Sequence, residues 1–212
     1  MVRFSTFVFL LMLGGCTIGR TMPMWTVPLE EDKTGAFGVS YAAGSLDTLG
    51  SHNVLWMHLG FRNKQLKKFG ILDDAVYWFN FGGGTYSEEG RTYYGGVASF
   101  NSSMMTSIPF DWFSVEFGIF TGFGMEMSNY VRDFFGNEPS DERGVAFYPW
   151  IYVGAPLNFR LDVGDKSSVS LGFVIQDIPP VVFTYGRFYT EPVTVFMGVK
   201  YRLYSLGFFM SY

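Results

Sequence analysis

The side chains that could carry out nucleophilic, acid–base or metal chemistry are few in this 212-residue chain. The ones that react or titrate most readily near neutral pH are the single cysteine, Cys16, and two histidines, His52 and His58. A histidine can act as the general base for a serine nucleophile or as a metal ligand. The sequence shows no serine partner for His58, and beyond Cys16 there is no thiol for a metal site or for cysteine catalysis. We therefore expect no catalytic residue, no metal and no cofactor, and we expect His58 to be bonded to a neighbouring side chain.

Charged residues form a second candidate group, because five of them fall on the same face of the predicted strands as His58. They are Glu116, Arg160, Asp162, Lys200 and Arg202. If that face is enclosed these charges must pair, since an isolated buried charge costs several kcal/mol. We expect the six side chains to form a polar network, and no two carboxylates in it suggest a catalytic pair.

The elements that would position these residues are β-strands, because apolar and polar residues alternate with a period of two. From Leu157 to Val163 every second residue is apolar, and the three residues between are polar. A turn at 164–167 follows, and the alternation resumes from Val169 to Ile175. This pattern predicts a hairpin with one apolar face and one polar or small face.

The alternation recurs along the chain and predicts eight to ten strands, most of them about 8 to 11 residues long, enough for a tilted strand to cross the hydrocarbon layer. Other segments with this pattern lie at 37–42, 54–62, 74–84, 91–101, 113–120, 144–154, 193–201 and 204–212. The pattern is weak over 177–192 and 201–204. No segment has the period of an amphipathic helix, and the polar stretch 125–143 indicates an exposed loop.

The composition bears on which face of these strands meets water. Aromatic residues make up 20% of the chain and charged residues only 16%, and there are 26 glycines. The less apolar face is rich in Gly, Ser and Ala and poor in Lys and Glu, which suits a narrow interior better than a solvated exterior. Aromatic residues gather near strand ends, at 110–113 and 147–150, as they do at membrane interfaces. A membrane barrel is therefore favoured over a soluble barrel or sandwich.

The last nine residues add to this interpretation. They place alternating apolar residues on one face, and the chain ends on an aromatic residue of that face, in the order Tyr204, Leu206, Phe208, Met210 and Tyr212. The segment resembles the terminal strand of bacterial outer-membrane β-barrels, which the barrel-assembly machinery reads as an insertion signal. The resemblance implies an all-β, antiparallel up-and-down transmembrane barrel of 8 to 10 strands over residues 34–212, and it points to no particular barrel family.

The N-terminus resembles a bacterial lipoprotein signal. Arg3 precedes an apolar run, 4–13, that is too short to span a bilayer, and Leu13-Gly14-Gly15-Cys16 follows. That stretch is similar to the lipobox, in which the cysteine is acylated, with palmitate as one expected chain, and becomes the mature N-terminus. The resemblance implies a signal peptide at 1–15, a lipidated tether at 16–33, and a protein anchored by lipid at the outer membrane of a diderm bacterium.

We expect side chains to fill the lumen of such a barrel. Eight strands leave an interior that side chains nearly fill, and ten strands leave slightly more room. Trp56, Trp78 and Phe120 share the inward face, which favours a plugged lumen over a small polar pore. The glycine-rich stretches 82–84 and 118–124 lack the Lys-Ser/Thr ending of a phosphate loop and fit a tightly curved barrel wall.

The favoured function is that of an outer-membrane β-barrel lipoprotein without enzymatic activity, in a structural, adhesive or small-solute-transport role. One alternative is a soluble β-barrel or sandwich lipoprotein that binds an apolar ligand, and a weaker one is a barrel enzyme that deacylates or acylates lipid A. The expected partners are outer-membrane lipid and the barrel-assembly machinery. The formal net charge of −4, or about −5 without Arg3, gives no reason to expect nucleic-acid binding.

Overall fold

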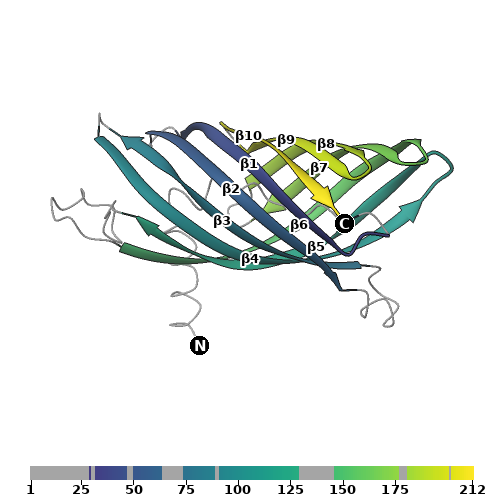
Figure 1. Ribbon diagram of the computed structural model, residues 1–212, viewed down its shortest axis with the longest axis horizontal. Coiled ribbons are helices and arrows are strands. Elements are labelled where there is room, and N and C mark those ends of the chain that lie inside the picture. Colours follow the sequence, from purple (N-terminus) through teal and green to yellow (C-terminus); the bar gives the residue numbers. More distant parts are fainter. Residues whose placement is uncertain are drawn as a thin grey trace.

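The protein is described by a computed structural model that covers residues 29, 32–46, 50–63, 74–88, 91–128, 146–176, 181–200 and 202–212. These residues form one closed barrel of antiparallel strands, in which each strand pairs with its neighbours in the sequence (Figure 1). The strands are β1 (Gly35–Leu46), β2 (Gly50–Asn63), β3 (Asp74–Glu88), β4 (Arg91–Pro109), β5 (Phe113–Ser128), β6 (Ala146–Gly164), β7 (Ser167–Gln176), β8 (Val181–Thr190), β9 (Val193–Lys200) and β10 (Leu203–Ser211).

The barrel closes where β1 pairs with β10, from Ala36 opposite Ser211 to Gly44 opposite Leu203. The predicted antiparallel barrel is confirmed, with ten strands. The sandwich alternative is wrong, because the first and last strands of a single sheet pair with each other and leave no second sheet. Among the described residues, no helix is long and apolar enough to cross a bilayer.

The strands are longer than predicted: β1 to β6 have 12 to 19 residues where about 8 to 11 were expected. Residues 146–154 and 157–163 belong to one strand, β6, which continues through Pro156. Its pairing with β5 skips Gly118 and Ile119, because proline offers no amide hydrogen to the ladder. β8 occupies part of the weak stretch 177–192. β5 runs to Ser128, so the predicted loop cannot begin at Met125, and 129–145 lie outside the described residues.

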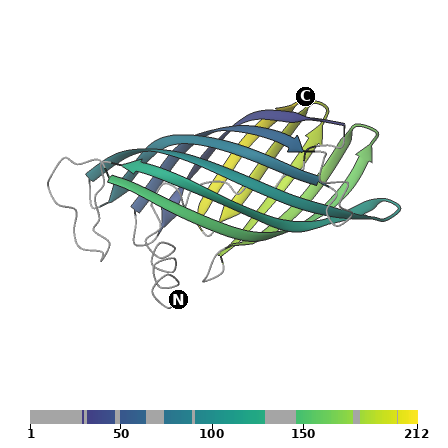
Figure 2. The ribbon, with the colours of Figure 1, turned by 90° about the horizontal axis from the view of Figure 1, so that it is seen from below.

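The start of β1 and the C-terminal Tyr212 lie at one end of the barrel, which we call the termini end. The amides of Thr34 and Gly35 donate to the carbonyl of Tyr212, at 2.8 and 3.1 Å. The β2–β3, β4–β5, β6–β7 and β8–β9 connections lie at this end because the strands run alternately up and down. The wall is uneven: β4 and β6 have 19 residues and β9 has 8, and Figure 2 shows the β4–β5 turn projecting past its neighbours.

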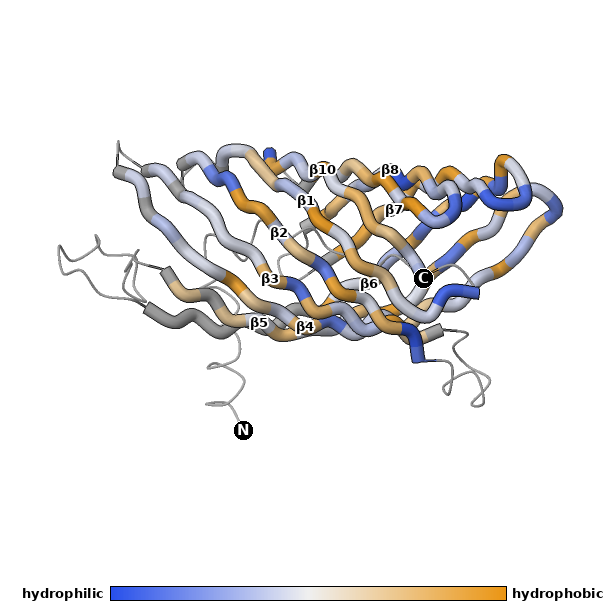
Figure 3. The backbone as a smooth tube through the Cα atoms, in the orientation of Figure 1, coloured by the Kyte–Doolittle hydropathy of each residue, from blue (hydrophilic) through white to orange (hydrophobic). Residues whose placement is uncertain are grey.

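Side chains alternate between the lumen and the outside on every strand, and burial in β10 alternates over all nine residues. Every strand exposes at least one large apolar side chain. The orange segments in Figure 3 show that hydrophobic residues recur along the wall. No described side chain on the outward alternation is charged. The charged strand residues whose side chains the structure describes all lie on the inward alternation, and they are Arg62, Glu116, Arg160, Asp162 and Arg187.

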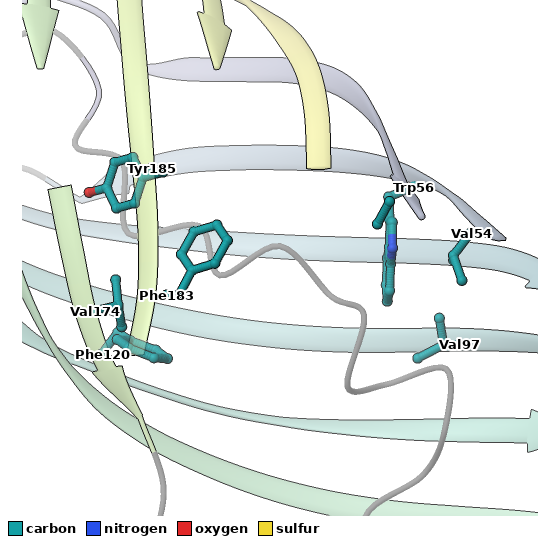
Figure 4. Packing of buried hydrophobic residues seen from close by; sticks show 8 residues of the cluster. Val54, Trp56, Val97, Phe120, Val174, Phe183 and Tyr185 are labelled. Atoms are coloured by element: carbon teal, nitrogen blue, oxygen red, sulfur yellow. The ribbon is translucent and has the colours of Figure 1, made fainter. Parts of the chain in front are cut away.

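Inside the barrel, apolar side chains pack in two clusters. The first contains Ala42, Val54, Trp56, Val97, Phe120, Val174, Phe183 and Tyr185 (Figure 4). The second contains Leu29, Ala36, Val76, Trp78, Phe196 and Phe209. Glycines on neighbouring strands make room for the rings: a Cβ atom on Gly60 would lie 2.6 Å from the Trp78 ring, and one on Gly82 would lie 2.7 Å from the Trp56 ring.

Candidate functional site in the barrel lumen

His58 lies in a hydrogen-bonded network that joins four strands across the inner wall. Its Nε2 atom is 2.8 Å from Oγ of Ser40 on β1, and its Nδ1 atom is 2.7 Å from Oδ1 of Asn80 on β3. The amide nitrogen of Asn80 donates to Oγ of Ser99 on β4 at 3.2 Å. Since the Asn80 oxygen is then left to accept, Nδ1 of His58 carries the proton and Nε2 accepts the Ser40 hydroxyl. All four side chains are buried.

Ser40, His58 and Asn80 stand in the order of a nucleophile, its general base and the group that orients the base. The sequence did not indicate Ser40 as the partner, because a cross-strand contact between β1 and β2 depends on their register. Ser40 is only 2% exposed, and the His58 ring is flanked by Trp56 and Phe209, each with its ring centroid 6.4 Å away. This enclosure suits a structural network better than acyl transfer.

A second polar group lines β5, β6 and β8. Nδ2 of Asn158 donates to Oε2 of Glu116 at 3.2 Å, and the Tyr185 hydroxyl donates to Oδ1 of Asn158. Arg160 contacts two carboxylates, with Nη1 4.0 Å from Glu116 Oε1 and Nε 2.8 Å from Asp162 Oδ1. Side-chain exposure rises from 8% at Glu116 to 23% at Arg160 and 57% at Asp162. The group therefore leads from the enclosed lumen toward the termini end.

The predicted network of six residues is thus divided. His58 belongs to one group, and Glu116, Arg160 and Asp162 belong to the other. The placement of Arg202 in the lumen is wrong: Arg202 is exposed in the turn before β10, whose first residue, Leu203, is the one that turns inward. Lys200 ends β9 and its side chain lies outside the described part of the chain, as does Cys16.

Arg187 on β8 is a lumenal charge that sequence reasoning missed. It is 3% exposed, and its Nη2 atom donates to Oγ of Ser170 on β7 at 3.1 Å. The signal was weak because Gly186 stands at an outward position, where an apolar residue would have marked the alternation.

A cavity of about 600 Å³, which we call the vestibule, lies where the second polar group reaches the termini end. Its lining residues are Asp32, Arg160, Asp162, Gly164, Asp165, Lys166, Ser167, Tyr189 and Glu191. Carboxylates outnumber cations in this lining. In the described part of the chain, no three His, Cys, Asp or Glu side chains are grouped so that they could hold a metal ion.

Glu191, in the β8–β9 turn, bridges two lysines at the edge of the vestibule. Its Oε1 atom is 2.6 Å from Nζ of Lys33, and its Oε2 atom is 2.7 Å from Nζ of Lys166. The hydrogen bonds from Lys166 and Lys33 lower the pKa of Glu191 to about 2. The same bonds are the largest cause of the raised pKa values of both lysines. All three groups therefore stay ionised at neutral pH.

Comparison with known proteins gives no family. No protein-family model matches the sequence, and no curated protein matches it. Solved structures with a partial likeness include Neisserial surface protein A (9% identity, TM-score 0.40, 84% of this chain and 96% of that chain). Two others are the β domain of the Bordetella autotransporter BrkA (9%, 0.43, 85% and 99%) and the attachment invasion locus protein Ail of Yersinia pestis (5%, 0.32, 84% and 94%).

Proposed function

We propose that this protein is an integral membrane β-barrel whose outward face contacts lipid hydrocarbon. The observation that carries the proposal is the distribution of charge across the wall. The described outward positions hold no charged residue, while large apolar side chains are exposed on all ten strands. A water-soluble barrel would carry Lys and Glu on that face, because soluble proteins rarely expose large continuous apolar surfaces.

The membrane we propose is the outer membrane of a diderm bacterium. In a closed barrel the backbone amides and carbonyls of every strand can form hydrogen bonds to neighbouring strands. This is the condition that a protein without membrane-spanning helices must meet to cross a bilayer. The terminal strand β10 alternates throughout and is followed by Tyr212, which is 63% exposed. This arrangement fits a substrate of the barrel-assembly machinery. The additional lipid anchor on Cys16 is supported by the lipobox-like sequence alone.

Within that membrane we propose a structural or adhesive role in preference to solute transport. The largest inward side chains fill the lumen, since Trp56, Trp78, Phe120, Phe196 and Phe209 are each at most 2% exposed. Single-channel recording in planar bilayers tests this choice. We expect no stepwise conductance from the wild-type protein, and reproducible steps would support transport instead.

Membrane extraction tests the barrel itself. The Cys16→Ser variant removes the proposed lipid anchor and leaves the strands unchanged, so we expect it to stay in the membrane pellet through carbonate and high-salt washes. We also expect a folded form that migrates differently from the boiled form on a denaturing gel. Release of Cys16→Ser without detergent would favour the soluble alternative.

The lipid anchor needs a separate measurement. Mass spectrometry of the mature N-terminal peptide is expected to show Cys16 as the first residue, carrying acyl chains, and metabolic labelling with palmitate is expected to fail in Cys16→Ser. Two or three chains anchor a protein firmly, whereas one gives marginal binding. An unmodified N-terminal peptide that still contains residues before Cys16 would rule out this anchor.

We propose that the barrel is not an enzyme, although the order of Ser40, His58 and Asn80 makes acyl transfer the alternative to test. Lipid A from cells that express the wild type, Ser40→Ala or His58→Ala is compared by mass spectrometry. Identical acylation in all three is expected. Loss of one lipid A species in both variants, with the barrel still folded, would establish the enzyme.

A further inference from the structure

The segment that precedes β1 enters the mouth of the barrel. We call the stretch from Leu29 to Thr34 the strap; the structure describes Leu29 and Asp32–Thr34 of it. Leu29 is only 5% exposed and belongs to the apolar cluster at the termini end. The other residues of this cluster come from β1, β3, β9 and β10, so Leu29 lies against the half of the wall that runs from β9 through β10, β1 and β2 to β3. The sequence predicts residues 29–33 as the end of the tether at 16–33.

Arg62, near the end of β2, holds the strap through its backbone. Its Nη2 atom donates to the carbonyl of Leu29, and its Nη1 atom donates to the carbonyl of Lys33 at 3.0 Å. One guanidinium therefore bonds both ends of the five-residue stretch 29–33. These two bonds fix the strap to one side of the mouth.

Lys33 ties the strap to the β8–β9 turn, which lies beyond β10 on the other side of β1 from Arg62. Its Nζ atom is 2.6 Å from Oε1 of Glu191 in the β8–β9 turn and 3.1 Å from Oδ2 of the adjacent Asp32. Glu191 is held in place by its second contact, to Lys166. Asp32 and Glu191 both line the vestibule, so the strap forms part of the vestibule wall.

These contacts differ in kind from those of the barrel wall. Each strand pairs with two neighbours through backbone ladders. The described strap residues before Thr34 are held instead by one apolar side chain, one guanidinium and the ion pairs of Lys33, whose side chain is 13% exposed. Segments with few buried contacts open at lower free energy than the fold as a whole. Opening of the strap would break these few contacts and leave every strand pairing of the barrel intact.

We propose that the strap is a detachable stopper over the apolar cluster at the termini end of the lumen, with Leu29 as its plug and Lys33–Glu191 as its latch. When the strap leaves, water and small polar solutes reach the apolar cluster and the polar groups behind it from that end. The proposal goes beyond the proposed function and does not depend on it, because it concerns only the strap and the inner face of the barrel.

Thiol accessibility tests the stopper in the full-length, folded protein. Ala36 is 1% exposed and packs in the same cluster as Leu29, so Ala36→Cys places a reporter thiol under the plug. Labelling by a small hydrophilic maleimide is followed by mass spectrometry of the peptides, which separates this thiol from Cys16. We expect slow labelling with the intact strap and labelling faster by about tenfold or more when Leu29→Asp is added, because a carboxylate is expelled from an apolar site.

The latch provides a milder variant and a matched control. Glu191→Gln removes the contacts to Lys33 and Lys166 and is expected to speed labelling by a smaller factor. Asp165→Asn makes the same acid-to-amide change in the vestibule lining and is expected to leave the rate unchanged. Heat-dependent gel mobility confirms that each variant is folded. The proposal would be overturned by fast labelling of Ala36→Cys with the intact strap. It would also be overturned by equal labelling rates in Ala36→Cys alone and in its combinations with Leu29→Asp and with Glu191→Gln.

Discussion

His58 illustrates how a single inward residue organises this lumen. Its two ring nitrogens are satisfied by Ser40 and Asn80, and Asn80 passes the network on to Ser99. A buried polar group costs free energy unless it is bonded, and each bond here comes from a different strand. The network therefore favours one register of β1 to β4 over slipped alternatives, in which these partners would not meet.

Replacing His58 by Ala tests the energetic weight of that network. The change leaves Ser40 and Asn80 without their buried partner and opens a cavity, so we expect the free energy of unfolding to fall by about 2–4 kcal/mol. Urea unfolding of the protein in lipid vesicles, monitored by tryptophan fluorescence, measures this free energy. Met57→Ala, on the exposed side of the same strand, is the control. A loss no larger than that of the control would mean that the network contributes little.

Glu191 makes part of the stability depend on pH. Its pKa is lowered from 4.5 to about 2 by the two lysines, so the ionised carboxylate is the form that stabilises the fold. The contribution is complete above pH 4.5 and is lost as the pH falls toward 2. Its size is limited because Glu191 keeps 27% of its side chain exposed and one of its partners, Lys166, is 74% exposed, so solvent screens the interaction.

We therefore expect Glu191→Gln to flatten the decline of the urea midpoint over this acidic range. The lysines remain cationic throughout it, since their pKa values are raised. Asp165→Asn serves as the control and should retain the wild-type slope. An unchanged slope in Glu191→Gln would show that other carboxyl groups govern acid unfolding.

At the scale of elements, large rings and glycines on adjacent strands determine how the strands pack. Trp78 on β3 lies over Gly60 on β2, and Trp56 on β2 lies over Gly82 on β3. Each ring occupies the volume that a side chain on the neighbouring strand would need. The many glycines of the chain were expected from wall curvature, and the structure adds this steric reason for those under the rings.

Gly60→Ala tests the steric argument. The added methyl would lie 2.6 Å from the Trp78 ring, so we expect the free energy of unfolding to fall by about 1–3 kcal/mol. In Gly186→Ala nothing lies within 4 Å of the new methyl, and we expect little change. Urea unfolding of both variants measures the difference. Equal stabilities would show that the ring shifts at no cost.

For the whole molecule, the central property is a barrel with its apolar side outward and its charges inside. A soluble barrel with the same strand pairing would have its polar side chains outward and its apolar side chains inside. Leu171 distinguishes the two, because it lies near the middle of β7 and is 49% exposed. In a bilayer this position faces hydrocarbon, and in water it would be an ordinary surface position.

Leu171→Lys is therefore expected to lower the free energy of unfolding from lipid vesicles by about 2–4 kcal/mol, the cost of a cation near the bilayer midplane. On a soluble barrel the same change should stay within about 0.5 kcal/mol. Asp165→Lys, in the β6–β7 turn, is the control and should be tolerated. Wild-type stability of Leu171→Lys would contradict the membrane location.

The sequence by itself determined the strand alternation, the division of residues into an apolar and a polar face, and the inward position of His58, Trp56 and Trp78. These features depend on a period of two, which is local to each strand. The sequence could not show that the segments before and after Pro156 form one strand, β6, and it did not reveal β8. A proline or a glycine interrupts the local alternation without breaking the pairing between strands.

Only the tertiary structure decided closure at ten strands, the contact between Ser40 and His58, the exposed turn position of Arg202, and the entry of Leu29 into the mouth. Each of these depends on register or on contacts between segments far apart in the chain, such as Lys33 with Glu191. Periodicity carries no information on such distances. These distances are set by the register between strands and by the packing of side chains in the closed lumen.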